Sequence, residues 1–140
     1  MSRRCPCGQK LDYAACCGPY VTGERPAPTA AALMRSRYTA YLEGAVDYLI
    51  ATTAAERRGG LDRAGLAAYC ATLRGVELRI VETTGGGPRD DAGFVTFEAT
   101  LKSNGRRFVQ RERSRFTREP ATGPDGRDVG AWVYVDGVLG

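Results

Sequence analysis

Two cysteine pairs near the N-terminus are the residues whose types and spacing most clearly suggest chemistry. They are Cys5 with Cys7, and Cys16 with Cys17, and they hold four of the chain's five cysteines. Thiolates at this spacing can converge on one tetrahedral zinc ion, which binds cysteine sulfur at about 2.3 Å. Such a short segment is too small to own a hydrophobic core, so we expect the metal to hold it together. Four sulfur ligands leave no open coordination position, and the predicted zinc is therefore structural.

Disulfides and a redox dithiol are the alternatives for these cysteines. A bridge within a pair is disfavoured, because neighbouring Cα atoms lie only about 3.8 Å apart, below the usual disulfide range. Bridges between the pairs remain open. The chain begins Met-Ser-Arg-Arg without the apolar run of a signal peptide, which favours a reducing cytoplasm, where clustered cysteines usually bind metal.

The arrangement CxC, spacer, CC resembles the SEC-C motif, which is named after the tail of the SecA translocation ATPase. Residues 26–41 (PAPTAAALMRSRYTAY) resemble the next signature of the bacterial YchJ family, and residues 111–116 (RERSRF) and 132–137 (WVYVDG) are similar to its last strands. In two departures from the family pattern, Gln9 and Lys10 replace the usual Ser-Gly, and Val21 stands where the family often has histidine.

The resemblance implies an architecture rather than an activity. It divides the chain into a SEC-C-like zinc-binding motif (1–20), a linker (21–28) and a nuclear-transport-factor-2-like, or cystatin-like, domain (29–140). In the SecA tail the motif presents a protein-binding surface, so the resemblance implies Lys10, Leu11 and Tyr13 as contacts for a protein partner. Cones of this kind often pair through the open sheet face, which implies a homodimer as a further option.

Composition describes an ordinary globular chain of 140 residues, large enough for one domain plus a small appendage. No run approaches the ~20 apolar residues of a membrane span. The formal charge of +4 allows weak attraction to polyanions without demanding it. Histidine is absent from the sequence, which excludes Ser-His-Asp and Cys-His catalysis and histidine metal sites.

Helices are expected in the first half of the chain and strands in the second. Thr29 and Gly44 are suited to cap a helix over 30–43, Asp47 to cap a short second helix, and residues 62–73 to form a third, stopped by Gly75. Alternating apolar residues predict strands at 76–80, 95–101, 106–117 and 131–135, with loops at 83–93 and 119–130 and a hairpin turn at Asn104-Gly105. This order predicts an α+β fold: three helices packed on a curved antiparallel sheet, forming a cone.

A polar pocket between helix and sheet is the second candidate site. Phe108 and Phe116 bracket one face of the third strand, so the residues between them on that face should point inward. A buried carboxylate there must be hydrogen-bonded, paired or protonated. The candidate pocket residues are Arg35, Tyr38, Tyr41, Gln110, Glu112 and Ser114. The simpler alternative is that Glu112 forms an ion pair with Arg35 or Arg37 and fixes the helix to the sheet.

The function predicted from these features is a cytoplasmic protein-interaction or small-ligand-binding module with a structural zinc motif. One alternative is a histidine-free pocket enzyme of the isomerase, dehydratase or hydrolase type. Nucleic-acid binding through Arg111, Arg113 and Arg115 is less well supported, because no aromatic residue alternates with them for base stacking.

Overall fold

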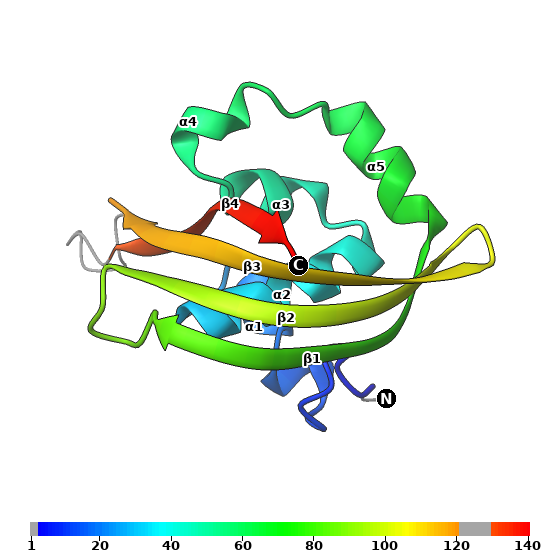
Figure 1. Ribbon diagram of the computed structural model, residues 1–140, viewed down its shortest axis with the longest axis horizontal. Helices are drawn as coiled ribbons and strands as arrows, with labels where there is room; N and C mark the ends of the chain where they lie inside the picture. Colours follow the sequence, from blue (N-terminus) through cyan, green and yellow to red (C-terminus); the bar gives the residue numbers. More distant parts are fainter. Residues whose placement is uncertain (1–2, 121–129) are drawn as a thin grey trace.

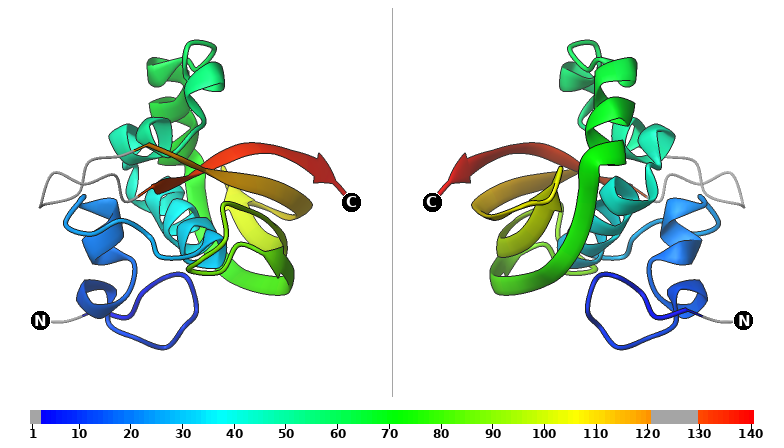
Figure 2. Two further views of the ribbon diagram at one scale, coloured as in Figure 1. Left: turned by 90° about the vertical axis from the view of Figure 1, so that its left-hand side faces the viewer. Right: turned by 90° about the vertical axis from the view of Figure 1, so that its right-hand side faces the viewer.

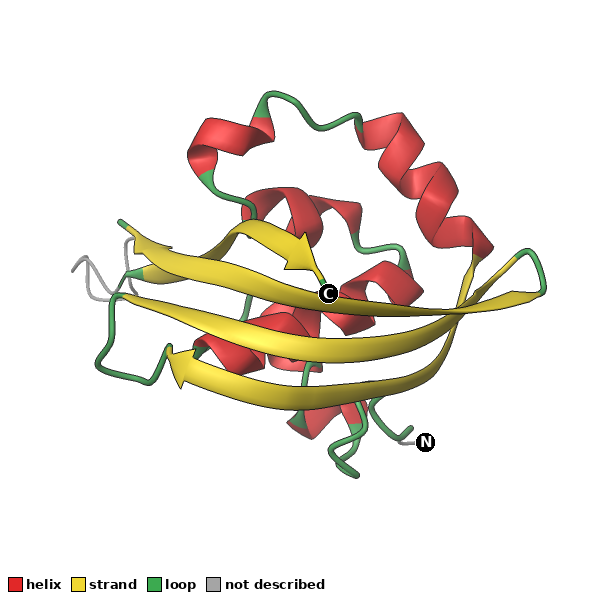
Figure 3. Cartoon of the chain, in the orientation of Figure 1, coloured by secondary structure: helices red, strands yellow, loops and turns green. Residues whose placement is uncertain are grey.

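The computed structural model describes residues 3–120 and 130–140 of the chain (Figures 1 and 3). Its helical elements are a 3-10 turn and five α-helices: η1 (Tyr13–Ala15), α1 (Gly18–Val21), α2 (Ala30–Glu43), α3 (Val46–Ala51), α4 (Ala55–Arg58) and α5 (Arg63–Thr72). The strands follow them in the order β1 (Leu73–Gly85), β2 (Ala92–Ser103), β3 (Arg106–Glu119) and β4 (Ala131–Leu139). Helices and strands are thus segregated, and the predicted α+β class is confirmed.

The four strands form one antiparallel sheet in the order β1-β2-β3-β4. Residues along β2 alternate between buried and less buried positions, as expected of a strand with one face on the core. The turn between β2 and β3 has Asn104 at φ 52° and Gly105 at φ 83°, a left-handed pair that suits a tight two-residue hairpin. The predicted hairpin turn is therefore confirmed.

Helix α2 lies along the concave face of the sheet, where it contacts β1, β2 and β4 (Figure 2). The Thr29 hydroxyl accepts a hydrogen bond from the Ala32 amide at 3.0 Å, and Gly44 ends the helix at φ 69°. Leu33, Met34 and Tyr38 are buried on the helix. Both predicted caps and the predicted bounds of this helix are confirmed.

The predicted count of three helices is too low for the described residues. The three helices expected in the domain correspond to α2, α3 and α5, and the four-residue helix α4 is additional there, while α1 lies in the N-terminal motif and linker. Among these elements α2 supplies most of the packing onto the sheet, whereas α4 and α5 arch away from it (Figure 1).

Two predicted helix boundaries are wrong. Asp47 does not cap α3: the N-cap is Ala45, and Asp47 lies in the first turn, where it pairs with Arg63. Gly75 does not stop α5 either, because the chain passes directly from Thr72 into β1. A Cβ on Gly75 would lie 2.7 Å from the hydroxyl oxygen of Tyr38, so this glycine instead leaves room for α2.

The sheet is also longer than predicted. Strand β1 extends to Gly85, β2 begins at Ala92, and β4 continues to Leu139, so the loop expected at 83–93 is correspondingly shorter. Most of the loop expected at 119–130 lies outside the described residues. None of the described helices has the length and apolar character needed to cross a membrane.

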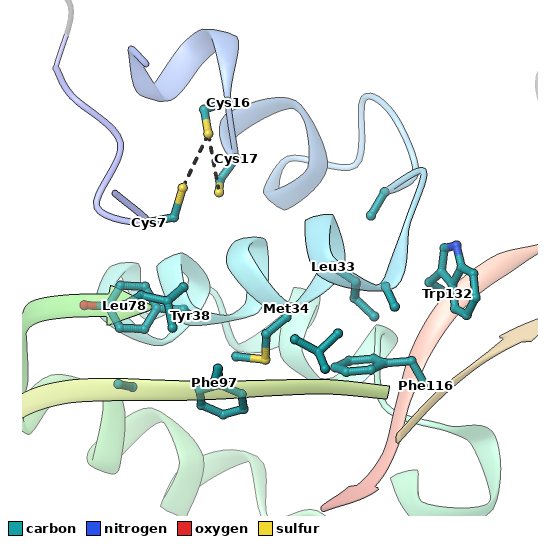
Figure 4. Close-up of a cluster of buried hydrophobic side chains, with 14 of the residues drawn as sticks. Cys7, Cys16, Cys17, Leu33, Met34, Tyr38, Leu78, Phe97, Phe116 and Trp132 are labelled. Atoms are coloured by element: carbon teal, nitrogen blue, oxygen red, sulfur yellow. Dashed lines mark hydrogen bonds between the residues drawn. The ribbon is translucent and has the colours of Figure 1, made fainter. Parts of the chain in front are cut away.

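The N-terminal motif shares its core with the rest of the molecule, contrary to the expectation that metal alone holds it together. Its four cysteines belong to the same buried cluster as Leu33, Tyr38 and Phe97, and Cys7 has no exposed surface (Figure 4). Arg35 on α2 donates a hydrogen bond from Nη1 to the Cys7 carbonyl oxygen at 2.9 Å. The motif therefore packs on one side of α2 while the sheet packs on another (Figure 2).

The close approach of two glycines at the connection between β1 and β2 leads to a prediction about stability. A Cβ on Gly93 would lie 2.3 Å from the nitrogen of Gly86 and 2.5 Å from the Cα of Gly86. The backbone of Gly86 also holds the start of α2, because its carbonyl accepts a hydrogen bond from the Ala30 amide at 2.9 Å. We expect Gly93→Ala to destabilise the fold by about 1–3 kcal/mol, measured by chemical unfolding. Gly59→Ala is the matched control, because Gly59 has helical φ and ψ and open space around it, and it should change stability by less than about 0.5 kcal/mol. Equal effects of the two substitutions would contradict this packing.

Candidate functional site

Four cysteine sulfurs meet in one buried cluster at the N-terminus. The Sγ atoms of Cys5, Cys7, Cys16 and Cys17 all lie within 4.8 Å of one another. Cys7 and Cys16 are 3.5 Å apart at sulfur, and Cys16 and Cys17 are 4.0 Å apart. A tetrahedral zinc–sulfur site with bonds of about 2.3 Å would place its sulfurs roughly 3.8 Å apart. The cluster therefore has the donor set and the spacing to hold a metal ion.

Local backbone contacts aim these sulfurs inward. The Cys5 amide donates to the Leu11 carbonyl at 2.7 Å and closes the loop between the pairs, and Gly8 turns within it at φ 88°. Gly18 follows the second pair, and a Cβ there would lie 2.8 Å from the Tyr13 carbonyl oxygen. All five cysteines are free thiols, so the disulfides that the sequence left open are absent.

The pKa values of Cys7, Cys16 and Cys17 shift in opposite directions, because these sulfurs are buried and crowded together. Hydrogen bonding from Cys17, against the opposing effect of burial, lowers the pKa of Cys7 to about 5. Burial raises the pKa of Cys16 to about 12, and the hydrogen bond to Cys7 raises the pKa of Cys17. Several thiolates can coexist at these distances only with a cation between them, which again fits a metal site.

The residues predicted as partner contacts divide into two kinds. Lys10 lies at the exposed tip of the loop with φ 61°, and the Leu11 side chain beside it is 47% exposed. Tyr13 is half-buried, because the Arg3 guanidinium stacks 4.0 Å from the centre of its ring. Lys10 and Leu11 are thus available at the surface, whereas Tyr13 packs within the motif.

A cavity of about 290 Å³ lies between the concave face of the sheet, α2 and α5. Five of the six predicted pocket residues line it, namely Tyr38, Tyr41, Gln110, Glu112 and Ser114. The remaining lining residues are Met34, Arg37, Tyr69, Leu73, Phe97, Ala99, Leu101 and Tyr134. Arg35 is the exception, because its guanidinium points to the Cys7 carbonyl on the other side of the helix.

Three aromatic residues of the cavity, Tyr69, Phe97 and Tyr134, were not among the predicted pocket residues. The alternation of β4 could have predicted Tyr134 as a pocket residue, because Tyr134 pairs with Phe116 of β3 and therefore lies on the same, inward-facing side of the sheet. Tyr69 lies on a helix whose position over the sheet depends on tertiary packing, and its edge meets Tyr41 at 6.4 Å between ring centres.

Glu112 sits inside the cavity as a carboxylate held by neutral donors. It accepts hydrogen bonds from the Ser114 hydroxyl, from the Tyr134 hydroxyl at 3.4 Å and from Gln110 Nε2 at 3.5 Å. Within residues 3–120 and 130–140 it forms no ion pair. The predicted pairing of Glu112 with Arg35 or Arg37 is therefore wrong.

Arg37 instead joins α2 to the end of α3. Its Nη1 donates to the Leu49 carbonyl at 3.0 Å and to the Thr52 hydroxyl at 2.7 Å, while its guanidinium lies 4.9 Å from the centre of the Tyr134 ring. Burial lowers the pKa of the Arg37 guanidinium. The charge is thus stabilised by dipoles and an aromatic ring rather than by a carboxylate.

The outer face of the sheet carries the arginines that sequence reasoning considered for nucleic acid. Each has a protein partner: Arg111 pairs with Glu98 at 2.7 Å, Arg115 pairs with Asp136 at 3.0 Å, and Arg113 stacks 3.8 Å from the centre of the Phe94 ring. The aromatic partner comes from the neighbouring strand β2, where the alternation of β3 alone could not reveal it.

The fold and the cysteine cluster define a class of protein in which a SEC-C motif is attached to a nuclear-transport-factor-2-like domain. A family model described as "YchJ, middle NTF2-like domain" matches residues 29–137. The UPF0225 protein of Corynebacterium glutamicum is 44% identical over 142 residues, covering 98% of this chain and 98% of that protein. The UPF0225 protein of Pectobacterium carotovorum is 43% identical over 141 residues, covering 99% of this chain and 84% of that protein. The chain belongs to the YchJ family.

Two solved structures agree with this assignment. The solution structure of RPA3114, a SEC-C motif containing protein from Rhodopseudomonas palustris, matches with a TM-score of 0.78 at 33% identity, covering 97% of this chain and 98% of that one. The crystal structure of a SEC-C motif containing protein from Psychrobacter arcticus matches with a TM-score of 0.82 at 24% identity, covering 99% and 83%, and supports the fold alone.

Three buried or partly buried tyrosines, two of which line the cavity, predict a loss of stability at high pH. Burial raises the pKa of Tyr38, Tyr48 and Tyr134 to about 12 in each case, from about 10 in an unfolded chain. Between these values the unfolded chain releases protons that the folded chain retains, so the unfolding free energy should be intact below about pH 10 and fall as pH rises towards about 12. Denaturant titrations across this range, with tyrosinate absorbance, measure the effect. Tyr38→Phe should make the fall shallower, and an equally steep fall in that variant would contradict the assignment.

Proposed function

We propose that this protein is a cytoplasmic small-ligand-binding module whose N-terminal motif holds a structural zinc ion. The observation that carries the proposal is the convergence of four buried cysteine sulfurs within 4.8 Å, in a motif that packs against α2, the helix that forms one wall of the cavity. In this proposal the metal maintains the motif, the motif supports α2, and α2 together with the sheet forms the binding cavity.

The choice of zinc follows from the chemistry of the four ligands. Four thiolates in tetrahedral spacing suit zinc, whereas calcium and magnesium prefer oxygen ligands. Cys5, Cys7, Cys16 and Cys17 would hold the ion, and when bound it would neutralise thiolate charge without an open position for substrate. Gln9 Oε1 lies 3.5 Å from Cys16 Sγ and Thr39 Oγ1 lies 3.8 Å from Cys5 Sγ, so both can orient the ligands from outside.

The cavity supports binding better than catalysis. Among the described residues of its lining, Glu112 is the one carboxylate and there is no histidine or lysine. The described lining therefore has no carboxylate–histidine or carboxylate–lysine pair for acid–base catalysis. Three hydrogen-bond donors around Glu112 and five aromatic residues in the walls suit recognition of a small molecule.

Replacing one ligand tests the metal assignment. We expect wild-type protein purified without chelator to contain one zinc per chain, and Cys7→Ser to lose it and to unfold roughly 10 °C lower, because structural zinc contributes several kcal/mol. Elemental analysis and a thermal melt provide the two measurements. Cys70→Ser is the matched control, because Cys70 is also a buried thiol but lies outside the cluster, and it should keep the metal. Equal zinc content in the two variants would refute the site.

The exposed tip of the motif is the proposed contact for a protein partner. The double substitution Lys10→Glu and Leu11→Asp reverses the charge and removes the apolar surface without touching a sulfur ligand, so zinc content and melting temperature should stay unchanged. Affinity capture from lysate should lose at least one protein that the wild type retains. Identical capture by both would remove this surface from the account.

A further inference from the structure

Glu112 occupies a position that two strands build around it. Gln110 and Ser114 flank it on the same face of β3, and Tyr134 reaches it from β4. Gly137 lies opposite Ser114 in the register, and a Cβ there would come within 2.4 Å of the Glu112 carboxyl carbon. The carboxylate is thus held in place by three donors and by the absence of a side chain on the neighbouring strand.

The charge of this carboxylate has no counter-ion in the described part of the chain. Its three donors are neutral groups, and none of the ion pairs among the described residues includes it. The other formal charge of the lining, Arg37, is engaged with the Leu49 carbonyl, the Thr52 hydroxyl and the face of Tyr134. The remaining titratable lining residues are the phenols of Tyr38, Tyr41, Tyr69 and Tyr134.

The walls around Glu112 are aromatic, and the space is small. Phe97 pairs with Glu112 in the β2–β3 register, and the four tyrosines lie along the rest of the lining. Aromatic faces attract organic cations, and a carboxylate adds a directed acceptor for their N–H groups. A volume of about 290 Å³ admits a molecule no larger than a small ring with a short substituent.

We propose that the cavity binds a compact organic cation, a primary amine or an amidinium on a small apolar body, with the Glu112 carboxylate as its anchor. This inference depends on the small-ligand function proposed above and adds the chemical class of the ligand. Glu112 would accept hydrogen bonds from the cationic nitrogen, while the apolar body would lie against Phe97 and the tyrosines.

Three probes of nearly equal shape test the proposal: benzylamine, benzyl alcohol and benzoate. Titration of the zinc-loaded full chain, followed by amide chemical shifts in NMR spectra, should show benzylamine binding at the cavity at least about tenfold tighter than benzyl alcohol, as a charged hydrogen bond to a carboxylate would provide. Benzoate should bind most weakly. Glu112→Gln should abolish the preference for benzylamine, and Glu98→Gln, which removes an equal charge from the outer face, should leave it intact.

A second variant separates the position of the carboxylate from its charge. Gly137→Ala should displace the flexible end of Glu112 while the fold is retained, and so weaken benzylamine but not benzyl alcohol. Tightest binding of benzoate, or an unchanged preference for benzylamine in Glu112→Gln, would overturn the proposal. Equal binding of amine and alcohol would refute the cationic class and leave the small-ligand function standing. Failure of all three probes to bind at millimolar concentration would contradict both.

Discussion

The structure depends on the packing of α2 between two partners that come from opposite ends of the chain. Leu33, Met34 and Tyr38 meet the sheet, while Arg35 binds the Cys7 carbonyl and Thr39 lies beside the Cys5 sulfur. A typical surface helix buries one apolar stripe and exposes the rest of its surface, whereas α2 packs against other elements on more than one side. We therefore expect a change in the motif to affect the sheet through α2.

This arrangement relates the two candidate sites to each other. Arg35 and Arg37 are two positions apart on α2. Arg35 binds the motif, whereas Arg37 binds the end of α3 and lines the cavity. Tyr38, which lines the cavity, also belongs to the buried cluster that contains the cysteines. Loss of the motif would therefore remove support from one wall of the cavity even though no cysteine reaches into it.

Local signals predicted much of this architecture. The cap residues Thr29 and Gly44 determined the bounds of α2, the Asn104-Gly105 turn set the hairpin, and the alternation of β3 placed Glu112 in the cavity. The spacing of the cysteines predicted their convergence. Each of these features is determined by a short stretch of sequence, because capping, turn formation and strand alternation depend on only a few neighbouring residues.

Most of the errors arose where tertiary contacts decide the outcome. For Arg35 the helical period itself gives the answer, because it places Arg37 on the face of Met34 and Tyr41, whereas Arg35 lies on the side that the motif covers. Gly75 has the composition of a helix stop, but its role is to make room for Tyr38 and Leu42 within a strand. The cysteines looked like a segment without a core because the surface that buries them is supplied by α2.

The central claim is that motif and domain form one cooperative unit through α2, and cobalt-substituted protein tests it directly. The sulfur-to-cobalt absorption band would report the metal site, and fluorescence of Trp132, the one tryptophan in the chain, would report the domain. Its indole nitrogen donates to the Pro28 carbonyl at 3.3 Å, and its ring lies in the shared core. In a denaturant titration the account predicts that both signals change together with one midpoint. Loss of the cobalt band well before any change in Trp132 fluorescence would show that the motif unfolds on its own and would contradict the account.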